Sequence, residues 1–378
     1  MDILLDYAFL RTVWWFLIGV LFFAFATMNG MDLGVAAISS VFFKKDEHRR
    51  VLLNTVGPVW EGNQVWLILG AGALFAAWPL FYSVLFSGLY LAMFGVLCAL
   101  ILRPVGFKFR SKMPSKTWRT VWDICIGIGG IVPSLGFGLV MGTMISGIDF
   151  YFQDDLRLFV THHPKHLLHP LALVSGLLWL LLFVTHGGIY LTMKTQGEIC
   201  AKLQRALPLR LWVSTLMVFL LFCVWQITVP QHIVIGVHDG PSNPLLKSVM
   251  MLPRMEGWFP SQPFMWVSFF IFTILTVLTA LVMHRRPGIA FTLSALRMAT
   301  VIFSMGYGAF PFILFSVTHP DHSLTVWDAS SSKLTLVIML FAAVLFVPLM
   351  IMAAQWVYRV LRGPVTVEGV NKNKDHWY

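Results

Sequence analysis

The feature that most constrains this chain is a series of long apolar runs that contain almost no charge. LALVSGLLWLLLFV at 171–184 and FFIFTILTVLTALVM at 269–283 are two examples. About 20 apolar residues suffice to cross a bilayer as a helix, and runs this apolar are not typical of soluble core helices. Charged residues make up 12% of the chain, about half of the ~25% typical of soluble domains. The sequence therefore predicts an all-α, polytopic membrane protein.

Nine apolar segments are long enough to form transmembrane helices. They lie at 10–43, 55–77, 80–102, 121–147, 168–193, 209–229, 263–283, 290–317 and 334–358. The first segment exceeds the length that a bilayer requires, so we expect it to be tilted or to project past the membrane.

Lysine and arginine residues are distributed unevenly between the two sets of connections. Twenty of the 27 lie at 44–50, 103–119, 194–210 and 285–286, or after 358. By the positive-inside rule these connections are cytoplasmic, so we expect the N-terminus outside and the C-terminus in the cytoplasm. The net charge of +10 is thereby explained by the loops, and we expect no nucleic-acid partner.

A weak internal repeat divides the chain. FATMNGMDL at 25–33 and FVTHGGIYL at 183–191 share the pattern F-x-T-x-x-G-x-x-L. Two parallel four-helix units would explain this match, and chance similarity between apolar segments is the alternative. The expected organisation is a single membrane domain. It has a first four-helix unit in 1–150, a second in 151–318, and a ninth helix with a cytoplasmic tail in 319–378.

Three ionisable residues fall within the predicted helices, where charge is costly and often functional. Asp32 lies toward the cytoplasmic end of the first segment, Glu61 about two turns into the second, and Arg103 at the end of the third. All three fall at similar depth, so neighbouring helices would bring them into one cluster. Such a cluster can relay protons, or it can fix helix packing as a buried ion pair and amide network.

The motif VWEGNQVW supplies most of the polar groups of this cluster. Glu61 and Gln64 are three residues apart and share a helix face, whereas Asn63 points elsewhere and is expected to bond to another helix. Trp60 and Trp66 are expected to pack around these polar groups.

Few residues of the chain are suited to hold a metal or a haem. The four cysteines form no C-x-x-C pair. His186 is the only histidine well inside an apolar segment, and a bis-histidine haem needs a second one at matching depth. The stretch HHPKHLLH at 162–169 is expected to be a solvated loop. We therefore expect no metal and no haem ligated by this chain, and we expect Arg297 to extend to the membrane interface.

Several blocks of the sequence resemble one family of membrane proteins. They are WWFLIGVLFFAFATMNGMDLGV at 14–35, WEGNQVWLILGAGALFAAWP at 60–79, YSVLFSGLYLAMFGVLCALILRPVGFKFRSK at 82–112 and SLTVWDASSSKLTL at 323–336. These blocks are similar to subunit II of the cytochrome bd-type ubiquinol oxidases, and the resemblance covers the whole chain.

The resemblance implies two four-helix bundles and one peripheral helix in the cytoplasmic (inner) membrane of a bacterium. It implies a haem-free, non-catalytic subunit of a complex that oxidises ubiquinol and reduces oxygen to water. The partner would be subunit I, which carries haem b and haem d and which subunit II helps to assemble. A structural ubiquinone, small single-helix accessory subunits and surrounding lipid are further partners that the family allows.

The resemblance also implies roles for individual residues, in a path that brings cytoplasmic protons to the haem. Asp32 matches the second acid of the family's D-G-x-D-x-G element, Glu61 the acid of W-D-G-N, and Arg103 the arginine of R-P-V-G-F. Asn29 replaces the first acid of that element, so a relay there would need another carrier. Glu61 replaces an aspartate and keeps the acid. A proton- or ion-coupled secondary transporter is the alternative interpretation of the same helices and acids.

Overall fold

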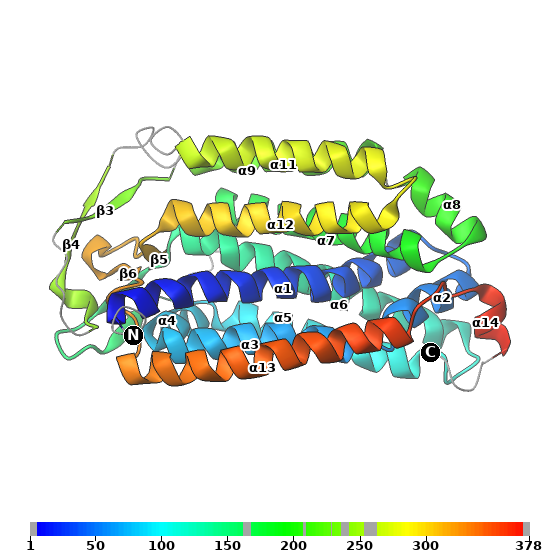
Figure 1. Ribbon diagram of the computed structural model, residues 1–378, viewed down its shortest axis with the longest axis horizontal. Coiled ribbons are helices and arrows are strands. Elements are labelled where there is room, and N and C mark those ends of the chain that lie inside the picture. The colour runs from blue at the N-terminus through cyan, green and yellow to red at the C-terminus, as the bar shows by residue number, and fades with distance from the viewer. Residues whose placement is uncertain are drawn as a thin grey trace.

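The computed structural model describes residues 6–161, 168–206, 209–227, 229–235, 242–252 and 263–372. Long helices lie side by side along the longest axis of the molecule, and short strands gather at the end that holds the N-terminus (Figure 1). The bundle helices are α1 (Tyr7–Val41), α3 (Trp60–Ala77), α4 (Pro79–Gly88), α5 (Tyr90–Phe109), α6 (Lys116–Ser146), α7 (Pro170–Lys194), α9 (Leu209–Ile227), α11 (Pro263–Val282), α12 (Pro287–Ala309) and α13 (Lys333–Val360).

Smaller elements cover the two ends of the bundle. Helices α2 (Asp46–Val56), α8 (Gly197–Ala206) and α14 (Val367–Lys372) lie at the end opposite the strands (Figure 1). The strands form three antiparallel pairs, which are β1 (Phe150–Phe152) with β2 (Leu158–Val160), β3 (His232–Ile235) with β4 (Ser248–Met251), and β5 (Phe312–Leu314) with β6 (Leu324–Thr325). The all-α prediction did not include these small sheets.

Local sequence signals explain where several helices begin and end. The side chain of Asp6 accepts a hydrogen bond from the backbone N–H of Phe9 and caps α1. Pro79 starts α4, and the chain bends by 118° between α3 and α4. Gly147 ends α6 with a φ of +86°, a conformation that favours glycine.

Seven helices are long and apolar enough to cross a membrane within the described part of the chain, namely α1, α5, α6, α7, α11, α12 and α13. The bent pair α3 and α4 would make an eighth span, and α9 is a shorter apolar helix. These findings agree with the predicted class of polytopic, mostly helical membrane protein. The predicted number of nine spans and their orientation remain predictions.

Three of the predicted segments have different boundaries in the structure. The second contains a turn at 57–59, so α3 begins only at Trp60. The third is broken at Leu89, between α4 and α5, and the eighth ends at Ala309, after which the chain forms β5. The first difference matters for the site, because it places Glu61 in the first turn of α3 and not two turns into a helix.

The centre of the bundle is formed by α1, α6 and α7, which pack against one another. Helix α1 also contacts α3 and α12, helix α6 contacts α5, and α7, α9, α11 and α12 pack as a second group. Aromatic side chains fill the space between the central helices, as shown by Phe137 and Trp179, whose ring centroids are 4.7 Å apart.

Glycines allow the central backbones to approach closely. A Cβ atom on Gly34 of α1 would overlap the carbonyl oxygen of Phe183 on α7, and one on Gly187 would lie 2.7 Å from the backbone nitrogen of Val35. A Cβ on Gly130 of α6 would likewise lie 2.7 Å from the α1 backbone. Small residues at such crossings are typical of membrane helices, where close van der Waals packing drives association. The two segments of the sequence repeat thus pack directly against each other.

An ion-pair network joins α2, α5 and α6 at the end opposite the strands. Arg110, whose side chain is 1% exposed, donates hydrogen bonds to Asp123 on α6 and to Asp46 on α2. Arg49 of α2 donates to the same Asp123 carboxylate. Because each buried charge here has an opposite partner, the network fixes how this end of the bundle is closed.

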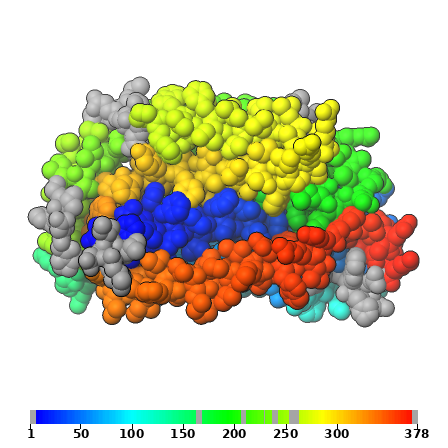
Figure 2. All heavy atoms as spheres, in the orientation of Figure 1, coloured from blue at the N-terminus to red at the C-terminus, as the bar shows by residue number. Residues whose placement is uncertain are grey.

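Helix α13 lies on the outer face of the bundle, where Figure 2 shows it as an orange-to-red band. It contacts α1 and α3, yet only 6% of its most apolar window is buried. A helix this apolar and this exposed requires lipid or another protein around it.

The close approach of α1 and α7 leads to a first prediction. Gly34→Leu should destabilise the protein by about 3 kcal/mol or more, because the new side chain would have to displace the α7 backbone. Thermal unfolding and yield of the detergent-purified protein measure this effect. Gly72→Leu in α3 is the matched control, because a Cβ there would meet no atom within 4 Å. Equal melting temperatures for the two variants would contradict the role given to this crossing.

Candidate functional site

A cluster of buried polar side chains lies where α1, α3 and α5 meet. Asn29 and Asp32 come from one face of α1, Asn63 from the first turn of α3, and Arg103 from α5. All four are at most 2% exposed. Because these groups cannot bond to water there, each depends on a partner within the protein. Predicted site residues from three separate segments of the sequence are therefore neighbours.

The guanidinium of Arg103 connects the three helices. Its Nη1 donates to Oδ1 of Asn29 at 3.1 Å, and its Nη2 donates to Oε1 of Gln64 at 3.1 Å. Both acceptors are neutral amides, and Asp32 is not within ion-pair distance of Arg103. The positive charge of Arg103 nevertheless acts on the Asp32 carboxylate. The cluster thus combines one buried cation and one buried carboxyl group with the three amides of Asn29, Asn63 and Gln64.

The carboxyl group of Asp32 is held on one side only. Its Oδ2 accepts a hydrogen bond from Nδ2 of Asn63 at 2.9 Å. Its Oδ1 has no hydrogen-bond partner among the described residues. A carboxylate oxygen that is buried and unbonded is costly, and it is also free to accept a proton.

Tyr358 extends this chain of hydrogen bonds to α13. Its hydroxyl donates to Oδ1 of Asn63 at 2.8 Å, so the Asn63 amide lies between Tyr358 and Asp32. The sequence analysis missed this residue, because a tyrosine near the end of an apolar segment is common at a membrane interface and carries no special signal. Only the packing of α13 on α3 brings it to the site.

Glu61 does not belong to the buried cluster, which corrects the predicted arrangement. Its side chain is 71% exposed, and its nearest charged partner is Lys108 of α5, at 4.0 Å. Glu61 was expected to share a face with Gln64, but only Gln64 reaches Arg103. The reason is that Glu61 is the second residue of α3, directly after the turn at 57–59, where its side chain is exposed.

The two tryptophans of the motif have different surroundings. Trp66 is 6% exposed and belongs to the central hydrophobic core. Trp60 is half-buried and makes an edge contact with Phe107, with ring centroids 6.5 Å apart. Both contacts are with apolar neighbours, and the expected packing of the tryptophans around the polar groups stays a prediction.

A second buried polar group lies between α1, α7 and α12. His186 contacts Ser294 through Nδ1 and the carbonyl oxygen of Thr27 through Nε2, each at 3.1 Å. Arg297 was expected to extend to the interface, but its side chain is fully buried. It donates to Thr185 at 2.6 Å and lies over the ring of Trp212. These contacts hold the guanidinium inside the bundle and make the interfacial prediction wrong.

Metal-ligating side chains do not gather anywhere in the described ranges. No group of three or more His, Cys, Asp or Glu residues is placed to hold a metal ion there. Most of the histidine-rich stretch at 162–169 lies outside these ranges, since the structure describes only residues 168 and 169 of it. Both ring nitrogens of His186 have partners, so neither is free to bind a haem iron without loss of a hydrogen bond.

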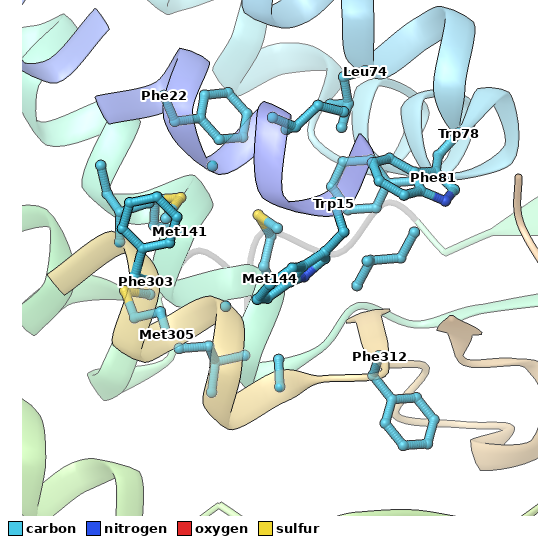
Figure 3. Close-up of a pocket in the computed structure, with 17 residues that line it drawn as sticks. Trp15, Phe22, Leu74, Trp78, Phe81, Met141, Met144, Phe303, Met305 and Phe312 are labelled. Carbon is cyan, nitrogen blue, oxygen red and sulfur yellow. The ribbon is translucent and has the colours of Figure 1, made fainter. Parts of the chain in front are cut away.

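An apolar cavity of about 90 Å³ lies near the strand end of the bundle (Figure 3). Trp15 and Phe22 of α1, Met141 and Met144 of α6, and Phe303 of α12 point toward it. No ionisable side chain lines this cavity. It is smaller than the ~300 Å³ typical of ligand pockets.

The amide partner of Arg103 leads to a second prediction. Asn29→Leu, which removes the acceptor of Nη1, should destabilise the protein by about 2–3 kcal/mol. Asn29→Asp has nearly the same volume and gives Arg103 a charged acceptor, so it should unfold at a temperature equal to or above that of the unmodified protein. Thermal unfolding in detergent compares the two variants. If both lower the melting temperature equally, the Asn29–Arg103 contact does not contribute to stability.

Comparison with known proteins places the chain in a family. The family model for cytochrome bd terminal oxidase subunit II matches residues 10–361. A protein of Haemophilus influenzae described as a probable cytochrome oxidase subunit 2 is 40% identical, over 99% of this chain and all of its own length. Cytochrome bd-I ubiquinol oxidase subunit 2 of Escherichia coli K12 is 38% identical, with the same coverage of both chains.

A solved structure has the same fold. A chain in the structure of bd oxidase from Geobacillus thermodenitrificans superposes with a TM-score of 0.68 and covers 93% of this chain and 98% of its own length. Its sequence is only 15% identical, so this likeness concerns the fold alone. Together with the match of the family model along nearly the whole sequence, the comparisons establish that the chain belongs to the cytochrome bd terminal oxidase subunit II family.

Proposed function

We propose that this chain is the haem-free subunit II of a bd-type quinol oxidase, which couples ubiquinol oxidation to the reduction of oxygen to water. Membership of the family and the name of the Escherichia coli relative support this function. In this proposal a partner, subunit I, carries haem b and haem d, and this chain supports its assembly without catalysing electron transfer itself. The exposed apolar surface of α13 is one place where a membrane partner or lipid is needed.

We infer that the complex lies in the cytoplasmic membrane of a bacterium, with the end that holds α2, α8 and α14 in the cytoplasm. This orientation is supported by the basic connections, which are attached to that end (Figure 1). In this proposal the chain divides into units at 1–150 and 151–318, with 319–378 as peripheral helix and tail. The packing of α1 and α6 against α7 joins the two units. The proposal also includes small accessory subunits, which are supported by the family resemblance alone.

The proton-related part of the function rests on Asp32. This carboxyl group is fully buried in the membrane-spanning bundle, is held through one oxygen and leaves the other without a partner. A purely structural carboxylate would be expected to use both oxygens in hydrogen bonds. The unpartnered oxygen is the single observation that most favours a group that takes up and releases a proton.

Each proton transfer at Asp32 is chemically simple. The carboxylate accepts a proton on Oδ1 and becomes neutral, and loss of the same proton restores the charge. Arg103, fixed by Asn29 and Gln64, stays nearby and keeps the charged form accessible. Glu61 is a second acid of the path in this proposal, located on the surface, where a partner subunit or the cytoplasm can reach it.

The proposal predicts a selective loss of activity. Asp32→Asn keeps the size of the side chain but cannot carry a proton, so oxygen consumption by the complex should fall roughly tenfold or more with haem content unchanged. Glu61→Gln should slow turnover less, because water can replace an exposed acid. Glu47→Gln, which removes an exposed charge from α2, is the control and should retain full activity.

Three results would contradict the proposal or a part of it. Purification of this chain from membranes without a haem-bearing partner, as a stable and independent protein, would exclude its function as an oxidase subunit. Ion-coupled uptake by that isolated chain in liposomes would favour a transporter instead. If Asp32→Asn loses haem and activity together, the residue supports assembly and does not relay protons.

A further inference from the structure

A groove lies between α1 and α13 on the outside of the bundle. The two helices are in contact and lie side by side in Figure 2, and we call the space of about 580 Å³ between them the α1–α13 groove. This volume is within the ~300–1,000 Å³ typical of ligand pockets. Ile351 and Gln355 in its wall are exposed, so the groove is open to whatever surrounds the bundle.

The wall of the groove changes from apolar to basic along its length. Both α1 and α13 run from the strand end of the molecule to the end that holds α2 and α14 (Figure 1). Nearer the strand end the wall consists of apolar side chains, such as Phe23 of α1 with Val347 and Ile351 of α13. At the opposite end it carries Arg359 and Arg362. One long site thus combines an apolar part with a strongly positive end.

The length of the groove matches one leaflet of a bilayer. Ile351, Gln355 and Arg359 follow one another at intervals of four residues and therefore share a face of α13. From Val347 to Arg359 the helix advances about 18 Å. Half of the hydrocarbon core of a bilayer is ~15 Å thick. When the apolar part lies at the depth of the acyl chains, the two guanidinium groups reach the level of the lipid head groups.

The positive end of the groove has no counter-charge within the described part of the chain. Neither Arg359 nor Arg362 forms an ion pair there, and no acidic residue lines the groove. Other arginines at the same end of the bundle are paired, since Arg49 and Arg110 both contact Asp123. A guanidinium group binds phosphate oxygens through two parallel hydrogen bonds, so two unpaired ones in the same groove favour an anionic phosphate ligand.

We propose that the α1–α13 groove binds one anionic phospholipid, whose phosphate is held by Arg359 and Arg362 and whose acyl chains lie along the apolar wall. A quinone head group is uncharged and would leave both arginines without a counter-charge, and a free phosphate ion would not use the apolar part. Basic sites between helices near the cytoplasmic surface are suited to such lipids. The proposal goes beyond the oxidase function and requires only the membrane orientation inferred above.

The bound lipid would stabilise the attachment of α13 to the bundle. Only 6% of the most apolar window of this helix is buried, so protein contacts alone cover little of it. A lipid in the groove would contact α1 and α13 together and would add apolar contacts between them.

Lipid binding to the assembled complex tests the role of the arginines. The detergent-purified complex, freed of bound lipid, is titrated with phosphatidylglycerol or with phosphatidylcholine of the same acyl chains, and binding is measured by native mass spectrometry. We expect the dissociation constant of phosphatidylglycerol to be about tenfold lower or more, and we expect Arg359→Gln with Arg362→Gln to abolish this preference. Arg285→Gln with Arg286→Gln is the control. It removes two exposed charges at the same end, neither of which lines the groove, and should leave the preference unchanged.

A second pair of variants tests the apolar part of the groove. Ala354 lines the groove, so Ala354→Phe fills part of it and keeps both arginines. We expect this variant to bind phosphatidylglycerol about tenfold more weakly, because the acyl chains lose their place. Ala353→Phe, at the neighbouring exposed residue that does not line the groove, should bind the lipid normally. This pair also decides the question if the double arginine variant fails to assemble.

Several results would overturn the inference. Equal losses in the two double arginine variants would mean that only the general surface charge attracts the lipid. Normal lipid binding by Ala354→Phe, with competition by inorganic phosphate, would reduce the site to an anion contact. A quinone or a small protein that co-purifies with the unmodified complex and is lost from Ala354→Phe would assign the groove to that occupant. Oxygen consumption by Asp32→Asn tests the proposed function independently of these results.

Discussion

The arrangement of this molecule depends on the close approach of α1 to α6 and α7. Gly34, Gly130 and Gly187 bring three backbones together at distances that no side chain would permit. In a membrane, where apolar side chains gain little from leaving lipid, such contact is a main source of helix association. It also fixes the rotation of α1. One face of the helix lies against α6 and α7, so the face that carries Asn29 and Asp32 is turned toward α3 and α5.

That rotation explains why a costly group is tolerated in the bundle. Arg103 is fully buried, and its desolvation is offset by hydrogen bonds to two amides and by the nearby charge of Asp32. The two amides accept hydrogen bonds from the guanidinium of Arg103 but do not neutralise its positive charge. One oxygen of the Asp32 carboxyl group is left without a hydrogen-bond partner among the described residues, which is costly for a buried polar atom.

Much of the fold could be predicted from the sequence, because hydrophobic length and loop charge are local properties. Apolar runs located the bundle helices, and the W-E-G-N-Q-V-W and R-P-V-G-F blocks indicated a family that the comparisons confirm. The boundaries were less predictable. The turn at 57–59 contains Gly57 and Pro58, and the break at Leu89 follows Gly88. Such residues mark a possible interruption, but hydrophobic length alone joins the segments on either side into one span. The predicted position of Glu61 was wrong for this reason. The predicted helix began too early, which placed Glu61 about two turns inside it and in the cluster, whereas its side chain is exposed. Arg297 was misplaced for a related reason, because depth estimated along a sequence cannot reveal that Thr185 and Trp212 would hold the side chain inside.

The sequence by itself determined that this chain is a membrane-embedded, mostly helical protein, and to which family it belongs. These properties follow from residue type and order, and they need no knowledge of which helices touch. The tertiary structure alone decided that Asp32 bonds to Asn63, that Arg103 bonds to Asn29 and Gln64, and that Tyr358 reaches the same site from a helix almost 300 residues away in the sequence. The physical reason is that hydrogen bonds between helices depend on crossing points and rotations, which are set by close packing of the whole bundle and not by any one segment.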